Sequence, residues 1–404
     1  MAVKDNSTVR WFTSDMAGAP ILDENPGAIV AILDACLING FGTATPDGNK
    51  ITVSGGVATV EFSGGNTFEK YAVIEIEGAT PSELNDVWRI TATTATTFSF
   101  DCPGIPDGNA TGSITVKRAT PGYWEKAFGD NLKAAYRSTH PDSYGFFIRV
   151  DDTAPYNDTF RVPVRCYAAM TDIDTGTDEF PTFADQPADN SSSNHQWTRI
   201  GAPAYAPANW AIVADERFFY FMPSYYNNRG AALYEFGDIV GAAPLDVFAC
   251  LTSADIRQST YPGQNCKAHE TRDSASAGYY FAASREGATR GPKASKVGIY
   301  GQNYLGNSDT YASSNIYPSP VSGGYLFLPV IVTQDKVMRG RAPGLLQTIT
   351  KLTSESRVPE NGVAKLIDKA HVNDNALLMV QLNFGSTNVL GSEVGVFDIE
   401  GPWR

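Results

Sequence analysis

The sequence predicts a mainly β protein with few helices, in which a β-rich main domain carries a small inserted antiparallel β-barrel or sandwich. Short runs of alternating apolar and polar residues, parted by Gly, Asn, Asp and Pro, recur along most of the chain. They are densest between residues 48 and 120, and one stretch near residue 30 has the apolar spacing of a helix instead. We therefore expect residues 1–47 and 121–404 to form the two parts of the main domain.

The stretch "GAPILDENPGAIVAILDACLINGFG" predicts a helix over residues 26–38. Pro26 suits the first helical position, Asn25 can cap it, and Gly40 stands where a left-handed terminating residue belongs. One face of the helix collects the apolar residues Ile29, Ile32, Leu33, Cys36 and Leu37. The thiol of Cys36 is therefore expected to pack in the core and not to act as a nucleophile activated by Asp34, which points elsewhere.

The insertion, residues 48–120, predicts five or six short strands joined by tight turns, which is the size of a small barrel. Its strand pattern is read from "KITVSG", "VATVEFSG", "YAVIEIEG", "DVWRITATTATTFSF" and "GSITVKRA". Trp88, Ile90, Phe98 and Phe100 fall on the inward side of the alternation. We expect these side chains to define the core of the barrel.

Beyond residue 120 longer irregular connections separate strongly apolar strands. The strand candidates are "YGFFIRVDD", "TFRVPVRCYAAM", "NWAIVADERFFYFMP", "GYLFLPVIVTQ", "ALLMVQLNFG" and "VGVFDIEG". The third is predicted to be a hairpin that turns at Asp215 and Glu216, with aromatic residues dense enough to be buried on both faces. Residues 171–194 and 252–295 are polar and aperiodic, and are predicted to be long loops.

Composition excludes several classes of function. The 404 residues carry a formal net charge of −13, which repels the phosphates of nucleic acids and anionic lipids. No apolar run is long enough to span a membrane, and no secretory leader is evident. The five cysteines are scattered, which predicts reduced, mostly buried thiols. We expect a protein made in a cytoplasm, without membrane insertion and without nucleic-acid binding.

Two segments offer candidate metal ligands. Cys266 and His269 in "CKAH" lack the second pair that a zinc site needs. In "DIDTGTDE" the carboxylates of Asp172, Asp174, Asp178 and Glu179 surround a glycine as in a calcium loop, but the twelve-residue pattern is incomplete. Whether this acidic segment binds calcium is left open, and no metal site is assigned.

The candidates for catalysis are equally incomplete. Asp151 and Asp152 follow a strand, where adjacent residues point to opposite faces and cannot act as a pair. The four histidines, His140, His195, His269 and His371, all lie in polar or loop-like sequence, and no nucleophile elbow or phosphate-binding loop is present. Arg339 and Arg341 precede Pro343 and Gly344 in a basic turn that could pair with a partner's carboxylates or with acids of the same chain. We assign no catalytic residue and no cofactor, and expect a protein that is not an enzyme.

Several segments together resemble a group of tailed-bacteriophage virion proteins of tail-related or unassigned role. The similarity rests on the opening helix, "IEGATPSELNDVWRITATTATTFSF", "GYWEKAF", "AAYRS", "MTDIDTGTDEFP", "MRGRAPGLL" and "FDIEGPWR", in this order. It touches most of the chain, although the barrel alone is a generic module of phage particles. No catalytic residues come with the resemblance.

The resemblance implies a non-enzymatic structural subunit of the virion, placed at the tail tip or baseplate as a multi-copy ring or cluster. Its partners would be copies of itself and other virion proteins. Two alternatives stay open. One is a capsid-associated or tail-tube lattice protein, and the other is a module that recognises a host receptor or glycan through the barrel or through the tyrosine-rich segments "MPSYYNNRG" and "YGQNYLGNSDTYASSNIYP". The terminal "GPWR" is expected to dock its aromatic residue on the core or on a neighbouring subunit.

Overall fold

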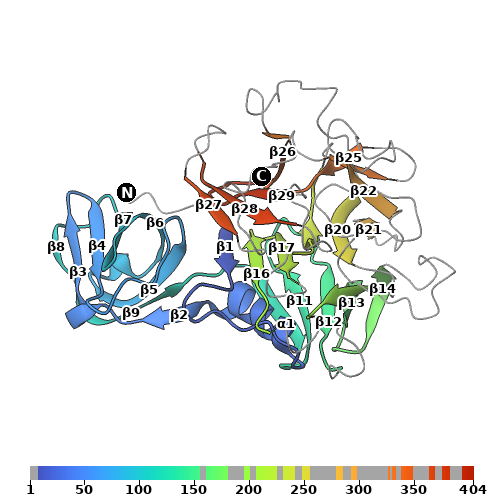
Figure 1. The fold of residues 1–404 in the computed structure, drawn as a ribbon, viewed down its shortest axis with the longest axis horizontal. Coiled ribbons are helices and arrows are strands. Elements are labelled where there is room, and N and C mark those ends of the chain that lie inside the picture. Colours follow the sequence, from blue (N-terminus) through green and yellow to red (C-terminus); the bar gives the residue numbers. More distant parts are fainter. Residues whose placement is uncertain are drawn as a thin grey trace.

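The chain is mainly β, as predicted, in a computed structural model whose described strands form four antiparallel sheets (Figure 1). The structure describes residues 8–154, 161–180, 195–200, 206–224, 231–241, 248–254, 279–284, 293–297, 326–327, 330–333, 338–348, 364–368, 375–382 and 394–404. Figure 1 shows the strands between residues 41 and 118, coloured blue to teal, as a lobe beside a larger body that contains the other three sheets.

The lobe is a closed barrel. Its strands, in spatial order, are β2 (Phe41–Ala44), β9 (Thr111–Arg118), β5 (Val73–Thr80), β6 (Val87–Thr93), β7 (Thr97–Asp101), β4 (Val57–Glu61), β3 (Ile51–Ser54) and β8 (Gly108–Asn109). The order closes on itself because β8 pairs with β3 and leads through Ala110 directly into β9. Trp88, Ile90, Phe98 and Phe100 are all buried in its core, as predicted. The sheet begins at Phe41, before the boundary expected at residue 48.

The largest sheet runs through the centre of the body. Its order is β1 (Arg10–Thr13), β16 (Trp210–Ala214), β17 (Phe218–Pro223), β18 (Tyr234–Asp238), β20 (Phe248–Ala254), β21 (Tyr279–Ser284), β22 (Lys293–Val297), β24 (Val330–Thr333), β25 (Met338–Arg341) and β19 (Val240–Gly241). Strands β16 and β17 form the predicted hairpin around Asp215 and Glu216, and every residue of both strands is buried. Burial on both faces follows from aromatic side chains that pack against a second layer on each side.

Two further sheets complete the body. One contains β10 (Trp124–Gly129), β11 (Lys133–Ser138), β12 (Phe147–Asp151), β13 (Arg161–Met170) and β14 (Gly176–Phe180), with β15 (Gln196–Thr198) paired to β13. The other contains β23 (Leu326–Phe327), β26 (Leu345–Thr348), β29 (Val394–Asp398), β28 (Leu377–Gln381) and β27 (Lys365–Ile367). The predicted loops are therefore wrong in part, because β14 and β21 lie inside residues 171–194 and 252–295, and β22 begins inside the second range. Short strands flanked by glycine and serine gave too little alternation to be recognised.

The predicted helix is present but is capped differently. It consists of α1 (Ala28–Leu33) and a wider π-helical segment, η1 (Asp34–Asn39). Two short 3₁₀ turns, η2 (Asp47–Asn49) and η3 (Ser82–Leu84), lie in the barrel. Gly27, with φ of 88°, occupies the N-cap position expected for Asn25. The cap comes from a distant strand end, since the Asp152 carboxylate accepts the Ile29 N–H at 2.9 Å.

The apolar face of the helix is buried as predicted, Cys36 included. Burial raises the pKa of the Cys36 thiol, which keeps it protonated. Cys102, Cys166 and Cys250 are also buried free thiols. No helix in the described ranges has the length and apolarity to cross a bilayer.

Candidate functional site

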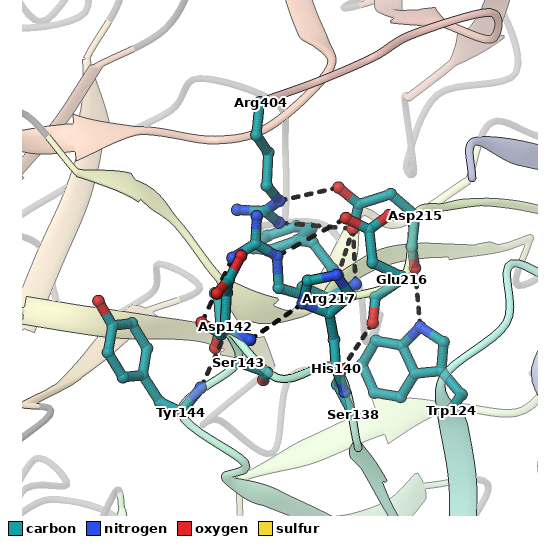
Figure 2. Close-up of polar contacts among 12 residues, drawn as sticks. Trp124, Ser138, His140, Asp142, Ser143, Tyr144, Asp215, Glu216, Arg217 and Arg404 are labelled. Carbon is teal, nitrogen blue, oxygen red and sulfur yellow. Dashed lines mark hydrogen bonds and ion pairs between the residues drawn. The ribbon is translucent and has the colours of Figure 1, made fainter. Parts of the chain in front are cut away.

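The turn of the β16–β17 hairpin lies at the centre of the cluster of polar and charged residues drawn in Figure 2. The Asp215 carboxylate accepts the backbone N–H groups of Arg217 and Phe218 through Oδ1, at 2.8 and 2.6 Å. The Trp124 indole N–H donates to the Asp215 carbonyl at 2.7 Å. Asp215 thus holds the turn in shape and joins it to β10.

Asp215 also binds the last residue of the sequence. Arg404 Nε donates to Asp215 Oδ2 at 3.0 Å, and its Nη2 lies 3.4 Å from Oδ1. The preceding Trp403 is buried and donates its indole N–H to the Asp398 carbonyl at 2.9 Å. The predicted docking of "GPWR" is confirmed, and it occurs on the core of the same chain.

Beside this pair a loop between β11 and β12 is fixed by Asp238. The Asp238 carboxylate accepts the Tyr144 N–H at 3.2 Å, and the Arg217 carbonyl accepts the Asp238 N–H at 2.9 Å. Arg217 Nη1 reaches the Asp142 carbonyl at 3.3 Å (Figure 2). In the same loop, His140 Nδ1 accepts the Asp142 N–H at 3.1 Å. We call this segment, residues 139–145, the β11–β12 loop.

Burial shifts two acids of the cluster toward their neutral forms. It raises the pKa of Asp238 to about 6, opposed by the Ser143 hydroxyl and by the charges of Arg404 and Arg217. Burial, and then the charge of Asp215, raises the pKa of Glu216. Asp238 is 4% exposed and its carboxylate is engaged with the β11–β12 loop. Its geometry suits it to hold this loop in place.

A second cluster of charges lies where the barrel meets the body. The Arg118 guanidinium, at the end of β9, pairs with the Glu69 carboxylate at 2.8 Å and donates to the Ala17 carbonyl at 3.0 Å. It also lies over the rings of Phe41 and Phe68. Its side chain is 1% exposed. A single buried cation therefore ties the barrel to the N-terminal segment of the body.

Further contacts cross the same joint. Arg89 of β6 donates to the Ile399 carbonyl at 2.8 Å and to the Val9 carbonyl at 3.2 Å. The Trp11 indole N–H donates to the Tyr71 carbonyl at 3.2 Å. Lys70 pairs with Asp368, just beyond β27, at 2.8 Å, and the Tyr71 hydroxyl contacts the same carboxylate. We call Arg118, Arg89, Trp11 and the Lys70–Asp368 pair the barrel joint.

Asp151 and Asp152 point to different partners, as predicted. Asp151 lies 3.4 Å from Lys133 Nζ and 3.3 Å from Arg149 Nη2, at the surface. Asp152 is buried and pairs with the equally buried Arg199 at 2.6 Å. Burial raises the pKa of Asp152 to about 6, opposed first by the charge of Arg199. The two carboxylates serve two separate ion pairs.

The acidic segment after β13 forms the turn that holds Asp172 and Asp174 and then the start of β14, which holds Asp178 and Glu179. Asp174 lies 2.8 Å from Lys133 and 2.9 Å from Arg149, and Glu179 pairs with Arg165 at 2.8 Å. Asp172 accepts the Asp174 N–H at 2.8 Å. Two of the four candidate oxygen ligands, Asp174 and Glu179, are thus engaged in ion pairs with basic side chains of the same sheet. Within the described residues, no group of three or more His, Cys, Asp or Glu side chains is placed to hold a metal ion.

The expectation for the histidines is wrong at His195. His195 is fully buried, and burial lowers the pKa of its imidazole to about 3. The sequence around His195 is polar and predicted an exposed loop. In the structure the His195 carbonyl accepts the Val164 N–H at 2.8 Å, and this bond to β13 places His195 in the interior. His140 lies in a half-buried loop, as expected.

Arg339 and Arg341 belong to strand β25 and not to a turn. Arg341 pairs with Val330 of β24 and with Val240 of β19, and Arg339 lies where the register between β24 and β25 shifts. Whether they meet a partner's carboxylates stays a prediction. Cys266, His269, His371 and most of the two tyrosine-rich segments lie outside the described residues.

Sequence reasoning missed Asp238, Arg118 and Arg199 as central charges. The hairpin turn and the terminal segment were both recognised, but their meeting through Asp215 and Arg404 depends on the tertiary fold.

Comparison with known proteins adds little to this picture. No family model and no curated protein matches the chain. Among solved structures it is similar to a chain described as "Phage phi92 endosialidase", at 11% identity and a TM-score of 0.15, over 90% of this chain and 71% of that one. A TM-score this low establishes no common fold, so no functional conclusion follows from it.

Proposed function

We propose that the chain is a non-enzymatic structural subunit of a tailed-bacteriophage virion, placed at the tail tip or baseplate in a multi-copy ring or cluster. Its partners would be copies of itself and neighbouring virion proteins. The proposal starts from the ordered motifs that resemble those of phage particle proteins, and the contacts between these motifs support it.

The motifs of the resemblance contact one another although they are far apart in sequence. Asp34 of the opening helix accepts hydrogen bonds from Lys126 in "GYWEKAF" and Tyr136 in "AAYRS", both at 2.8 Å. Gly344 of "MRGRAPGLL" lies against the Trp403 indole of "GPWR", so closely that an added Cβ would stand 2.0 Å from Cε2. Shared motifs that pack together favour a resemblance of the whole main domain over one confined to the generic barrel.

The observation that carries a structural role is the fixed attachment of the barrel. The barrel has a hydrophobic core of its own, separate from that of the body. The barrel joint nevertheless fixes it in place through the buried Arg118 and the bonds from Arg89. A rigid projecting lobe suits a subunit that must present a surface to neighbours at a defined angle.

Suppressing synthesis of the chain during infection tests the proposal. An amber codon early in its gene, in a non-suppressing host, should yield filled heads with absent or incomplete tails, and supplying the wild-type chain should restore complete particles. Complete particles that lack the chain and still infect would overturn the proposal. Complete particles that adsorb but fail to penetrate the cell wall would favour an enzyme instead.

A further inference from the structure

We propose that the β11–β12 loop and the neighbouring Tyr123 form a carbohydrate-binding surface. This inference is independent of where the chain sits in a particle. It rests on two exposed tyrosines, one of them in ring contact with His140, and on polar groups of the loop with open hydrogen-bonding capacity.

Two exposed tyrosines flank the loop. Tyr123 is 51% exposed and Tyr144 is 41% exposed. The Tyr123 ring meets the His140 imidazole edge to face, with centroids 4.8 Å apart. Aromatic faces bind the C–H groups of sugars because the face of the ring is electron-rich and largely apolar.

The backbone of Tyr123 adopts a conformation that its own side chain disfavours. Its φ is 60°, in the left-handed region that bulky residues rarely enter. The Tyr123 carbonyl holds it there by accepting the N–H and hydroxyl of Thr139, at 2.7 and 2.8 Å. A strained and exposed aromatic residue gains little from packing, so the strain points to a function for its ring.

The polar side chains of the loop are held in place and still have free hydrogen-bonding capacity. His140 Nδ1 accepts the Asp142 N–H, so in the neutral ring the proton lies on Nε2, which has no hydrogen-bond partner in the described part of the chain. The Asp142 carboxylate likewise has none there, whereas its carbonyl is held by Arg217 at 3.3 Å. One donor and one acceptor thus face outward from a loop fixed by Arg217 and Asp238.

This mixture of groups favours a neutral sugar over other ligands. Asp142 and Arg217 carry opposite charges, so the surface does not select a ligand of one sign. The net charge of −13 disfavours nucleic acid. The exposed carboxylate of Asp142 interrupts the continuous apolar area that a hydrophobic peptide needs. Hydroxyl groups that both donate and accept match Asp142 and His140.

Saturation-transfer NMR with short oligosaccharides of glucose, galactose, mannose and N-acetylglucosamine tests the proposal on the full chain. We expect transfer to the C–H protons of at least one of these sugars at millimolar concentration. Tyr123→Gly should abolish that signal while keeping or raising the melting temperature, because glycine relieves the left-handed strain. Tyr123→Phe should retain the signal, and Asp142→Asn or Tyr144→Ala should weaken binding roughly threefold to tenfold.

Ile21→Ala is the matched control, since Ile21 is an exposed apolar side chain (63%) elsewhere on the surface. It should leave the transfer unchanged. Two results would overturn the proposal: no transfer to any sugar of the set, or a signal that survives Tyr123→Gly and Asp142→Asn together. Binding of a protein partner that these two variants abolish, without any sugar signal, would also reject it.

Discussion

At the scale of single residues, the body of this chain contains a buried ion pair that links three of its elements. Arg199 and Asp152 are 1% and 0% exposed and lie 2.6 Å apart, and Asp152 also caps α1 through the Ile29 N–H. Removing one partner of such a pair leaves a buried charge alone, which is worse than losing both. The ion pair therefore joins a strand end, a helix start and the segment after β15.

Arg199→Met should lower the free energy of unfolding by about 3–5 kcal/mol, because it leaves the Asp152 carboxylate buried without its cation. The double variant Arg199→Met with Asp152→Asn should recover part of the lost free energy of unfolding, because no buried carboxylate is then left without its cation. Urea denaturation followed by tryptophan fluorescence measures both. A single variant as stable as the wild type would contradict the buried pair.

Asp238 gives stability a defined pH dependence. Its pKa in the folded chain is about 6, above the unfolded value near 3.8, so the folded state binds the proton more tightly between these two values. Stability should therefore fall as pH rises through this window, by about 3 kcal/mol for the full shift. Asp238→Asn should flatten this part of the profile of melting temperature against pH. An unchanged slope in the variant would reject the assignment to Asp238.

The residue scale also shows how far sequence reasoning reached. Local alternation sufficed to predict that Asp151 and Asp152 point apart. It could not supply Arg199, which becomes the partner of Asp152 only when β13 and β15 pair. The burial of His195 also follows from the pairing of β13 and β15, which cannot be predicted from the polar residues around His195 in the sequence.

At the scale of elements, strong local signals were reliable and weak ones were not. The β16–β17 hairpin was predictable because a dense apolar run is interrupted by two acids at the turn. Strands β21 and β22 were missed because they are short and lie within long polar segments, and their pairing into the central sheet is set by neighbours. The start of α1 was misplaced because its cap is the distant Asp152.

The terminal segment makes a prediction at this scale. Trp403 is 6% exposed and packs edge to face on Tyr220, with Gly344 directly against its indole. Trp403→Ala should lower the free energy of unfolding by about 3–5 kcal/mol. Gly344→Ala should also destabilise the fold, since φ there is 65° and the new methyl would collide with the ring.

Thermal unfolding measures the two variants, and Met338→Ala serves as their control because Met338, at the start of β25, is an apolar side chain that is 55% exposed. Equal melting temperatures for Trp403→Ala and the wild type would show that the segment does not dock as described.

At the scale of the whole molecule, the contacts of the barrel joint fix the orientation of the barrel relative to the body. The barrel could move freely on its connections if no buried contact crossed the joint. Arg118 prevents this by linking Glu69 and Ala17, on opposite sides of the joint. Burial raises the pKa of Glu69, and the charge and hydrogen bond of Arg118 oppose this shift. The predicted insertion thus becomes a fixed arm.

Arg118→Met should cost about 1–3 kcal/mol and loosen the arm, because Glu69 is one-third exposed and can regain water. Hydrogen exchange should speed up at amides on both sides of the joint, and small-angle scattering should show a broader distance distribution. Lys50→Met, at an exposed cation of the barrel, is the matched control and should change neither. An unaltered scattering profile for Arg118→Met would mean that the joint is fixed by other contacts.

The measurement that tests the central claim most directly is to locate the chain on intact phage particles. An epitope inserted at the exposed β3–β4 turn after Gly55, where an added Cβ meets nothing within 4 Å, leaves the barrel core untouched. Antibody labelling in electron microscopy, with copy numbers from mass spectrometry of separated heads and tails, should place a few to about a dozen copies at the tail end. Label over the head or along the tube would contradict the tail-tip position, and particles without the chain would contradict the structural role itself.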